Sequence, residues 1–260
     1  MLIQEKQNEY FNKRFQCLLK HLNAFSSSKD PADLHKFRLE IKKTNALISL
    51  LSAHSGNNKI KSHFKPVRRI FKFAGKIRDL QLNLAFIENR QLYDEAFYKE
   101  QKENMAIQTQ QFCKNIKLYE LVIQKAFEIL IKHTKNISEN FIISEINSQV
   151  KQITRFIIEF DYKDNPHKCR KLIKYILFIS NLYKPVKQKM NHFIQYLDKL
   201  QVLIGEWHDI IDIIKWAQHP KSHISISEKK LLDEKEQKMV VMLKFLNRFS
   251  FHLYNSLYPK

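Results

Sequence analysis

The segment KPVRRIFKFAGKIRDL, residues 65–80, repeats basic and apolar side chains with the period of an α-helix. At about 100° per residue, an arc of roughly 100° contains five cations: Lys65, Arg68, Arg69, Lys72 and Lys76. The opposite side is mainly apolar: Val67, Ile70, Phe73, Ala74 and Ile77. The segment therefore predicts an amphipathic helix with one basic face. Because proline fits only the first turn of a helix, Pro66 places the beginning of this helix close to Lys65.

The rest of the chain favours the same kind of structure. Glycine and proline number only 3 and 6 among 260 residues, and 44% of the residues are hydrophobic. A sheet-rich chain of this length needs more turn residues, so we predict an all-α fold. The expected helical segments are about 3–25, 31–51, 59–91 and 94–133, followed by about 138–160, 166–183, 187–217 and 226–257. Asp30-Pro31 and Asn165-Pro166 each place a capping residue before a proline at the start of a helix.

Two motifs recur at almost the same spacing. The pattern H-x-x-R-x-x-x-K begins at His35 and again at His167, 132 residues later. The pattern G-x-x-R/H-D begins at Gly75 and again at Gly205, 130 residues later. We interpret this recurrence as an internal duplication within a single domain of residues 1–260. It predicts two tandem antiparallel four-helix bundles, residues 1–135 and 136–260, related by a pseudo-twofold axis around a basic central groove.

The two recurring glycines fall inside expected helices. Glycine in a helix interior costs about 1 kcal/mol relative to alanine, so another feature must offset this cost. We expect Gly75 and Gly205 to permit the close approach of a neighbouring helix.

The charge of the chain indicates the class of ligand. Lys and Arg number 45 against 26 Asp and Glu, which gives a formal net charge of +19. Residues 41–78 contain ten Lys or Arg and no acidic residue. Such an excess attracts nucleic acid, anionic membranes, polyphosphate or acidic proteins, although a generally basic surface for solubility remains the plainer interpretation of the total charge.

Several classes of function are disfavoured. Cys17, Cys113 and Cys169 are far apart in the sequence and form no CxxC pair, so neither a disulfide framework nor a zinc knuckle is expected. There is no apolar run of 18 residues and no signal-like N-terminus, which predicts a cytoplasmic protein without a membrane span. The sequence has no glycine-rich phosphate loop, HExxH motif or nucleophile elbow. We therefore expect no enzymatic activity, no cofactor and no metal.

A second basic face precedes the first. His35, Arg38 and Lys42 lie within an arc of about 60° on the expected helix 31–51, with Lys43 at its edge. If this helix packs against the helix of residues 65–80, the two faces form a groove. A linear phosphate polymer needs a continuous series of cations, with guanidinium groups for bidentate contacts. Single-stranded nucleic acid needs exposed aromatic residues among the cations, whereas Phe64, Phe71 and Phe73 are expected mainly in the core.

These residues resemble the CHAD family, the conserved-histidine α-helical domain. The segments that carry the resemblance are LHKFRLEIKK at 34–43, FAGKIRDL at 73–80, PHKCRKLIK at 166–174 and LDKLQVLIGEWHD at 197–209. The resemblance covers nearly the whole chain, and the last segment is the most specific. It implies a duplicated helical-bundle fold whose basic cavity binds inorganic polyphosphate, with no catalytic activity of the domain itself. It also suggests a role in directing the protein to polyphosphate granules.

The resemblance and the charge pattern together give a set of candidate binding residues. The resemblance implies His35, Arg38, Lys42, Arg78, His167, Arg170, Lys174 and Lys199. The basic faces add Lys43, Lys65, Arg68, Arg69, Lys72 and Lys76. Asn45, Tyr175 and Leu177 stand where the family usually has a further basic residue, which predicts a weaker contribution from the second half.

Two other functions remain as alternatives. A nucleic-acid-binding helical protein would explain the charge, but no helix-turn-helix, zinc-finger or RNP-like motif is present. A metal-dependent enzyme of phosphate chemistry would use His35 or His208, yet the neighbouring residues of His35 are cations and disfavour a bound metal. We expect Asp79 and Asp209 to orient basic residues rather than to act in catalysis.

Overall fold

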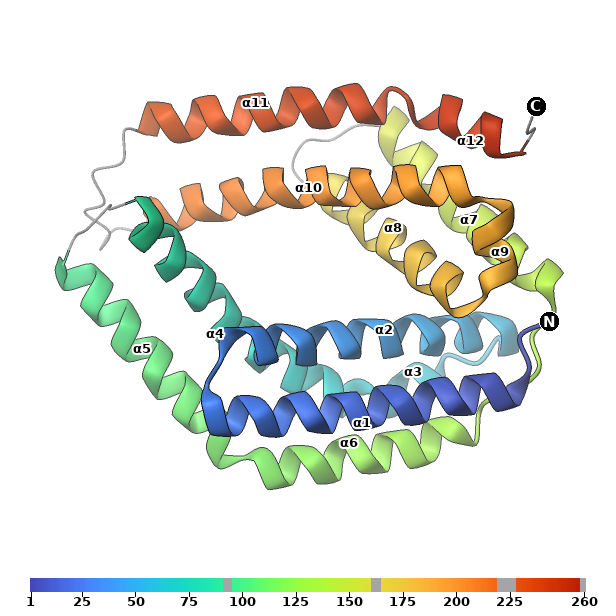
Figure 1. Cartoon of the computed structure of the whole chain (residues 1–260), viewed down its shortest axis with the longest axis horizontal. Helices are drawn as coiled ribbons and strands as arrows, with labels where there is room; N and C mark the ends of the chain where they lie inside the picture. The colour runs from blue at the N-terminus through green and yellow to red at the C-terminus, as the bar shows by residue number, and fades with distance from the viewer. Residues whose placement is uncertain (91–94, 160–164, 219–227, 258–260) are drawn as a thin grey trace. The chain divides into compact units, whose positions relative to one another are not determined.

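The computed structural model describes residues 1–90, 95–159, 165–218 and 228–257. Within these ranges the chain forms helices and one isolated antiparallel bridge, between Leu2 and Ile137 (Figure 1). This confirms the predicted all-α class. The chain divides into two compact units, Met1–Glu139 and Asn140–Lys260, and each is considered by itself below.

Six described helices form unit 1. They are α1 (Gln4–Ser28), α2 (Pro31–Ser55), α3 (Lys59–His63), α4 (Lys65–Arg90), α5 (Glu95–Lys114) and α6 (Ile116–Ile131). α1 packs against α2 and α6, and α4 packs against α2, α5 and α6 (Figure 1). α2 and α4 therefore lie side by side, as the predicted groove requires.

Phenylalanine side chains fill the core of unit 1. The ring of Phe127 on α6 lies 5.9 Å from Phe11 and 6.3 Å from Phe64, both in edge-on geometry. Phe112 on α5 lies 5.9 Å from Phe25 of α1. Edge-to-face pairs of this kind add about 0.5–1.5 kcal/mol beyond the area they bury. This core holds α1, α5 and α6 together and positions the segment that leads into α4.

Six described helices also form unit 2. They are α7 (Glu139–Ile158), which begins at the boundary between the units, α8 (Asn165–Leu182), α9 (Lys184–Lys189), α10 (Asn191–Ala217), α11 (Glu228–Leu246) and α12 (Phe249–Leu257). α10 is the central helix and packs against α8, α11 and α12. Phe193 of α10 meets Phe249 of α12 at a ring distance of 5.5 Å, and both side chains are buried.

The helix boundaries agree with several predictions. α4 begins at Lys65, with Pro66 in its first turn. α2 begins at Pro31, and the carboxylate of Asp30 accepts a hydrogen bond of 2.8 Å from the amide of Ala32. Asn165 behaves differently from the prediction, because its side-chain amide donates to the carbonyl of Glu159, 2.7 Å away, at the end of α7. It therefore joins α8 to α7.

The prediction of four continuous helices per half was too simple. The segments 59–91, 94–133, 187–217 and 226–257 are each interrupted, giving the pairs α3–α4, α5–α6, α9–α10 and α11–α12. Proline explains the first break, since Pro66 cannot donate the amide hydrogen bond that a continuous helix needs. The break at Asn115 has no such marker, and the apolar pattern continues through it.

Candidate functional site

The candidate site in unit 1 lies along the contact between α2 and α4. Arg38 of α2 donates a hydrogen bond of 2.8 Å from Nη1 to the carbonyl oxygen of Phe71. Further along, Arg68 of α4 donates from Nε and Nη2 to Oδ1 of Asn45, at 3.2 and 2.6 Å. Residue numbers therefore rise on α2 as they fall on α4, so the two helices run antiparallel and their predicted basic faces meet.

Gly75 has a specific steric role in this contact. A Cβ atom added at Gly75 would lie 2.4 Å from Nη1 of Arg38. Real Cβ atoms essentially never approach another heavy atom that closely, so Gly75 leaves the space that the guanidinium occupies. The close approach expected from the sequence is confirmed, but the neighbour is a side chain rather than a helix backbone.

Phe71 lies under two cations rather than in the core. Its ring centroid is 4.3 Å from Cζ of Arg38 and 5.8 Å from Nζ of Lys42. The expectation of a core residue holds for Phe64, which is fully buried. Phe71 and Phe73 are both half-buried, but Phe73 packs on Phe112 with ring centroids 5.5 Å apart. The α2–α4 contact therefore contains an aromatic ring that is already covered by a guanidinium.

The remaining cations of α4 are mostly exposed. Lys65, Arg69, Lys72 and Lys76 are exposed, and Arg68 is half-buried. On α2, His35 and Lys42 are exposed on the side that carries Arg38. We call these cations of α2 and α4 the unit 1 basic face: His35, Arg38, Lys42, Lys65, Arg68, Arg69, Lys72, Lys76 and Arg78.

Arg78 and Asp79 act electrostatically on the arginines at one end of this face. Burial lowers the pKa of Arg38 from its ordinary value; the Asp79 carboxylate opposes this shift, and Arg78 adds to it. Burial likewise lowers the pKa of Arg78, again opposed by Asp79. Both guanidinium groups stay charged because the ordinary pKa of arginine is above 12. Asp79 thus stabilises two neighbouring cations electrostatically.

Lys43 points away from the basic face. Its ammonium lies 2.8 Å from Oε1 of Glu40, whose other carboxylate oxygen is 2.6 Å from Nη1 of Arg14 on α1. Glu40 is buried, so this network belongs to the contact between α1 and α2. Lys43 is therefore placed by the structure outside the set of residues that α2 and α4 bring together.

Unit 2 repeats the arginine–glycine arrangement between α8 and α10. Nε of Arg170 donates to the carbonyl oxygen of Gln201 at 3.1 Å. A Cβ atom added at Gly205 would lie 2.3 Å from Nη2 of Arg170. In both units the carbonyl that accepts the arginine hydrogen bond is four residues before the glycine. Burial raises the pKa of Asp209, four residues after Gly205, and Arg170 is the main group that lowers it.

The structure adds His208 to the residues of unit 2. The rings of His167 on α8 and His208 on α10 lie 4.9 Å apart and tilted by 31°. Nδ1 of His208 is 3.0 Å from Oδ2 of Asp212, whereas Nδ1 of His167 is buried without a hydrogen-bond partner among the described residues. Burial is the main cause that lowers the pKa of His167, followed by Lys171 and His208. The recurrence of the glycine motif contained this signal, since His208 aligns with Arg78.

Comparisons with known proteins bear on this geometry. The family model of the CHAD domain matches residues 9–218. The chain belongs to the CHAD domain family. The crystal structure of the CHAD domain from the plant Ricinus communis matches with a TM-score of 0.70 and 11% sequence identity, covering 98% of this chain and 92% of that chain. At this identity the likeness shows the fold alone. No curated protein sequence matches the chain.

Two further predicted site residues of this CHAD domain, Lys199 and Lys174, are placed differently by the structure. Lys199 on α10 lies about 120° around the helix from Gly205, so it is not beside Arg170. Its side of α10 carries Glu206, whose carboxylate is 2.7 Å from Lys238 of α11. Lys174 is half-buried on α8 and lowers the pKa of Asp209. We call the α8–α10 set the unit 2 basic face: His167, Arg170, Lys174 and His208.

The positions that depart from the family pattern have structural partners. Asn45 accepts the two hydrogen bonds of Arg68. The hydroxyl of Tyr175 donates to Oε1 of Glu145 on α7 at 3.2 Å, and Leu177 is buried. In unit 1 the departure fixes a cation of the basic face, whereas in unit 2 the two departures serve packing.

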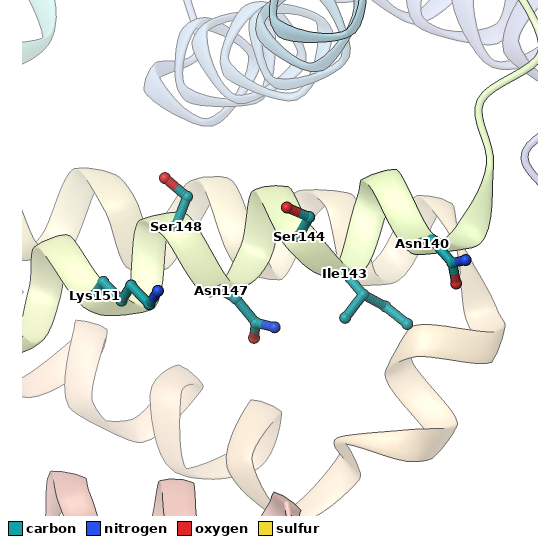
Figure 2. A pocket seen from close by; sticks show the side chains of 6 residues that line it. All are labelled: Asn140, Ile143, Ser144, Asn147, Ser148 and Lys151. Atoms are coloured by element: carbon teal, nitrogen blue, oxygen red, sulfur yellow. The ribbon is translucent and has the colours of Figure 1, made fainter.

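Other parts of the CHAD domain offer less to an anionic ligand. A shallow depression runs along α7, where Asn140, Asn147 and Lys151 are among the lining residues (Figure 2). Lys151 is the one charged side chain among the lining residues, so this depression offers an anion a single cation (Figure 2). No group of three or more His, Cys, Asp or Glu side chains in the described ranges could hold a metal ion.

Among the residues that the structure describes, no helix is both long and apolar enough to span a bilayer.

Proposed function

We propose that this CHAD domain binds inorganic polyphosphate without turning it over, using the basic faces of units 1 and 2. The proposal rests mainly on the unit 1 basic face, where the exposed cations of α4 lie beside those of α2. Lys65 and Lys76 are eleven residues apart, which corresponds to roughly 16 Å along a helix. A flexible polymer with a negative charge on every phosphate can contact several of these cations at once.

The half-buried arginines give the faces their preference for phosphate oxygens. Arg38 and Arg170 each donate one hydrogen bond to a backbone carbonyl of the facing helix, and this bond fixes the guanidinium plane. A guanidinium has five N–H donors, so several remain for a ligand. Fixed guanidinium groups lose less conformational entropy on binding than flexible lysines, and their forked geometry suits phosphate.

The surroundings of Phe71 favour polyphosphate over single-stranded nucleic acid. Base stacking needs an open aromatic ring, and stacked bases contribute about 1–3 kcal/mol each. The ring of Phe71 is covered by Arg38 at 4.3 Å, so it supports a cation instead of a base. A ligand without bases loses nothing by this arrangement.

The absence of catalysis is part of the proposal. The carboxylates of Asp79 and Asp209 act electrostatically on Arg38 and Arg170, respectively. Their charge is thereby committed to stabilising cations. We further propose that binding of several phosphates at once directs the protein to polyphosphate granules in the cytoplasm.

A triple substitution on α4 tests the proposal. Lys65→Gln, Lys72→Gln and Lys76→Gln together remove three exposed charges from the unit 1 basic face. Hydrogen bonds to charged groups contribute about 1.5–3 kcal/mol each, so we expect polyphosphate affinity at about 150 mM salt to fall at least tenfold. Isothermal titration calorimetry with long-chain polyphosphate, and separately with single-stranded DNA of equal charge, measures the affinities.

The matched control removes three exposed lysines elsewhere in unit 1. Lys13→Gln, Lys20→Gln and Lys125→Gln, on α1 and α6, change the net charge equally. We expect this control to weaken binding by about twofold or less, because only a diffuse field is reduced. Equal losses in both triple variants, or DNA binding as tight as polyphosphate binding, would refute a polyphosphate site on α2 and α4.

A further inference from the structure

The two basic faces differ in one ionisable position. Arg78, three residues after Gly75 on α4, is always charged near neutral pH. The position three residues after Gly205 on α10 is His208, whose imidazole is charged only when protonated. The charge of the unit 2 basic face therefore depends on pH through His208, at a position where unit 1 has Arg78.

His167 and His208 form a pair across the contact between α8 and α10. Their ring centroids are 4.9 Å apart, and Asp212 holds Nδ1 of His208 at 3.0 Å. Nδ1 of His167 is buried and has no hydrogen-bond partner among the described residues. A buried polar atom without a partner is costly, and a turn of the half-buried ring would let a protonated Nδ1 donate to a ligand oxygen.

Charged groups of both signs face this pair. On α8 the cations Arg170 and Lys171 oppose protonation of His167, and on α10 Asp212 favours it. Asp209 of α10 also lies within the electrostatic reach of His208 and Arg170. Burial and the neighbouring cations lower the pKa of His167 more than Asp212 raises it, so the negative charge of a bound polyanion would favour the protonated imidazole.

We propose that the His167–His208 pair is a proton-dependent phosphate-binding element, at which a polyphosphate segment binds together with protons taken up from solution. This inference rests on the polyphosphate-binding function proposed above. A bound polyanion favours the charged form of a nearby imidazole. By linkage, a group that is more protonated in the bound state makes binding tighter as pH falls through its titration range.

Calorimetry in two buffers with different ionisation enthalpies counts the protons taken up. We expect the affinity of the full-length chain for long-chain polyphosphate to rise about fivefold between about pH 8 and about pH 6, with net proton uptake near pH 7. Long chains are used because terminal phosphates, with a pKa of about 6, titrate in the same range. The same titrations are made on a chain that carries Lys65→Gln, Lys72→Gln and Lys76→Gln. In that chain, the remaining polyphosphate affinity comes mainly from unit 2.

His208→Gln is the decisive variant, and His192→Gln is its control. His192 is an exposed histidine on the same helix, so its loss removes one titrating group without touching the pair. We expect His208→Gln to lose most of the gain in polyphosphate affinity between about pH 8 and about pH 6, because glutamine takes up no proton in this range. His192→Gln should keep that gain. His167→Gln provides a second variant if His208→Gln does not fold.

The outcomes separate this inference from the proposed function. Polyphosphate binding with the same pH dependence in the unsubstituted chain, His208→Gln and His167→Gln would overturn the role of the pair and leave the proposed function intact. If no polyphosphate bound at any pH at about 150 mM salt, the proposed function would fail and the inference with it. NMR titration of the histidine ring protons, with and without polyphosphate, gives an independent measure of the same protonation.

Discussion

At the scale of single residues, Gly75 and Arg38 act as one unit. Nη1 of Arg38 occupies the space where a Cβ atom of residue 75 would lie, at 2.4 Å, and it donates to the carbonyl of Phe71 at 2.8 Å. The glycine therefore destabilises α4 by its helix propensity but permits a charge-assisted hydrogen bond between two helices. Which effect is larger determines the sign of a substitution.

We expect Gly75→Ala to destabilise unit 1 by about 1 kcal/mol. The displaced guanidinium loses a hydrogen bond worth about 1.5–3 kcal/mol, and alanine regains about 1 kcal/mol of helix propensity. In an Arg38→Ala background no guanidinium is displaced, so the same substitution should stabilise the protein by about 1 kcal/mol. Urea unfolding of the four proteins of this double-mutant cycle measures the reversal of sign.

Gly56→Ala is the matched control for that cycle. Gly56 ends α2 with a left-handed φ of 63°, and an added Cβ atom would have no neighbour within 4 Å. Its substitution costs about 1 kcal/mol of backbone strain, with or without Arg38. If Gly75→Ala changed stability by the same amount in both backgrounds, the steric link between Gly75 and Arg38 would be wrong.

At the scale of helices, the start of α2 depends on Asp30. Its carboxylate accepts from the amide of Ala32 at 2.8 Å, and its negative charge lies at the positive end of the helix dipole. We expect Asp30→Ala to lower the free energy of unfolding by about 1 kcal/mol, and Asp30→Asn to lower it by less than half as much. Chemical denaturation followed by circular dichroism measures both. An equal loss in the two variants would show that capping is not the cause.

The sequence predicted the long helices better than their interruptions. Amphipathic periodicity and the proline positions were enough to place α2 and α4 within a few residues of their observed bounds. The break at Asn115 was missed because the side chains on both sides continue one apolar pattern. Local signals specify where a helix can form, whereas tertiary contacts decide where it bends.

The candidate site was predicted in part. The basic faces of α2 and α4 follow from helical spacing, and the contacts of Arg38 and Arg68 show that these helices meet. Two assignments needed the structure. Lys43 pairs with Glu40 of the same helix, which also pairs with Arg14 of α1, and His208 approaches His167 only because α8 and α10 pack together. The spacing of residues within one helix does not predict which side chains of another helix they contact.

At the scale of the whole molecule, the net charge of +19 acts on stability and on binding in opposite ways. Repulsion among the cations destabilises the folded state, because folding brings them closer together than they are in the unfolded chain. The same cations attract a polyanion. Salt screens both interactions, since the Debye length falls from about 14 Å at 50 mM to about 4 Å at 500 mM.

Raising NaCl over this range should therefore increase thermal stability while it weakens polyphosphate binding. We expect the lowest thermal transition to rise by about 2–4 °C, which corresponds to about 1 kcal/mol for a chain of this size. Over the same range the affinity should fall at least tenfold, because each displaced counterion contributes to the salt dependence. Differential scanning calorimetry and isothermal titration calorimetry in identical buffers give the two values. A transition that fell with salt would mean that ion pairs such as Arg14–Glu40 outweigh the repulsion.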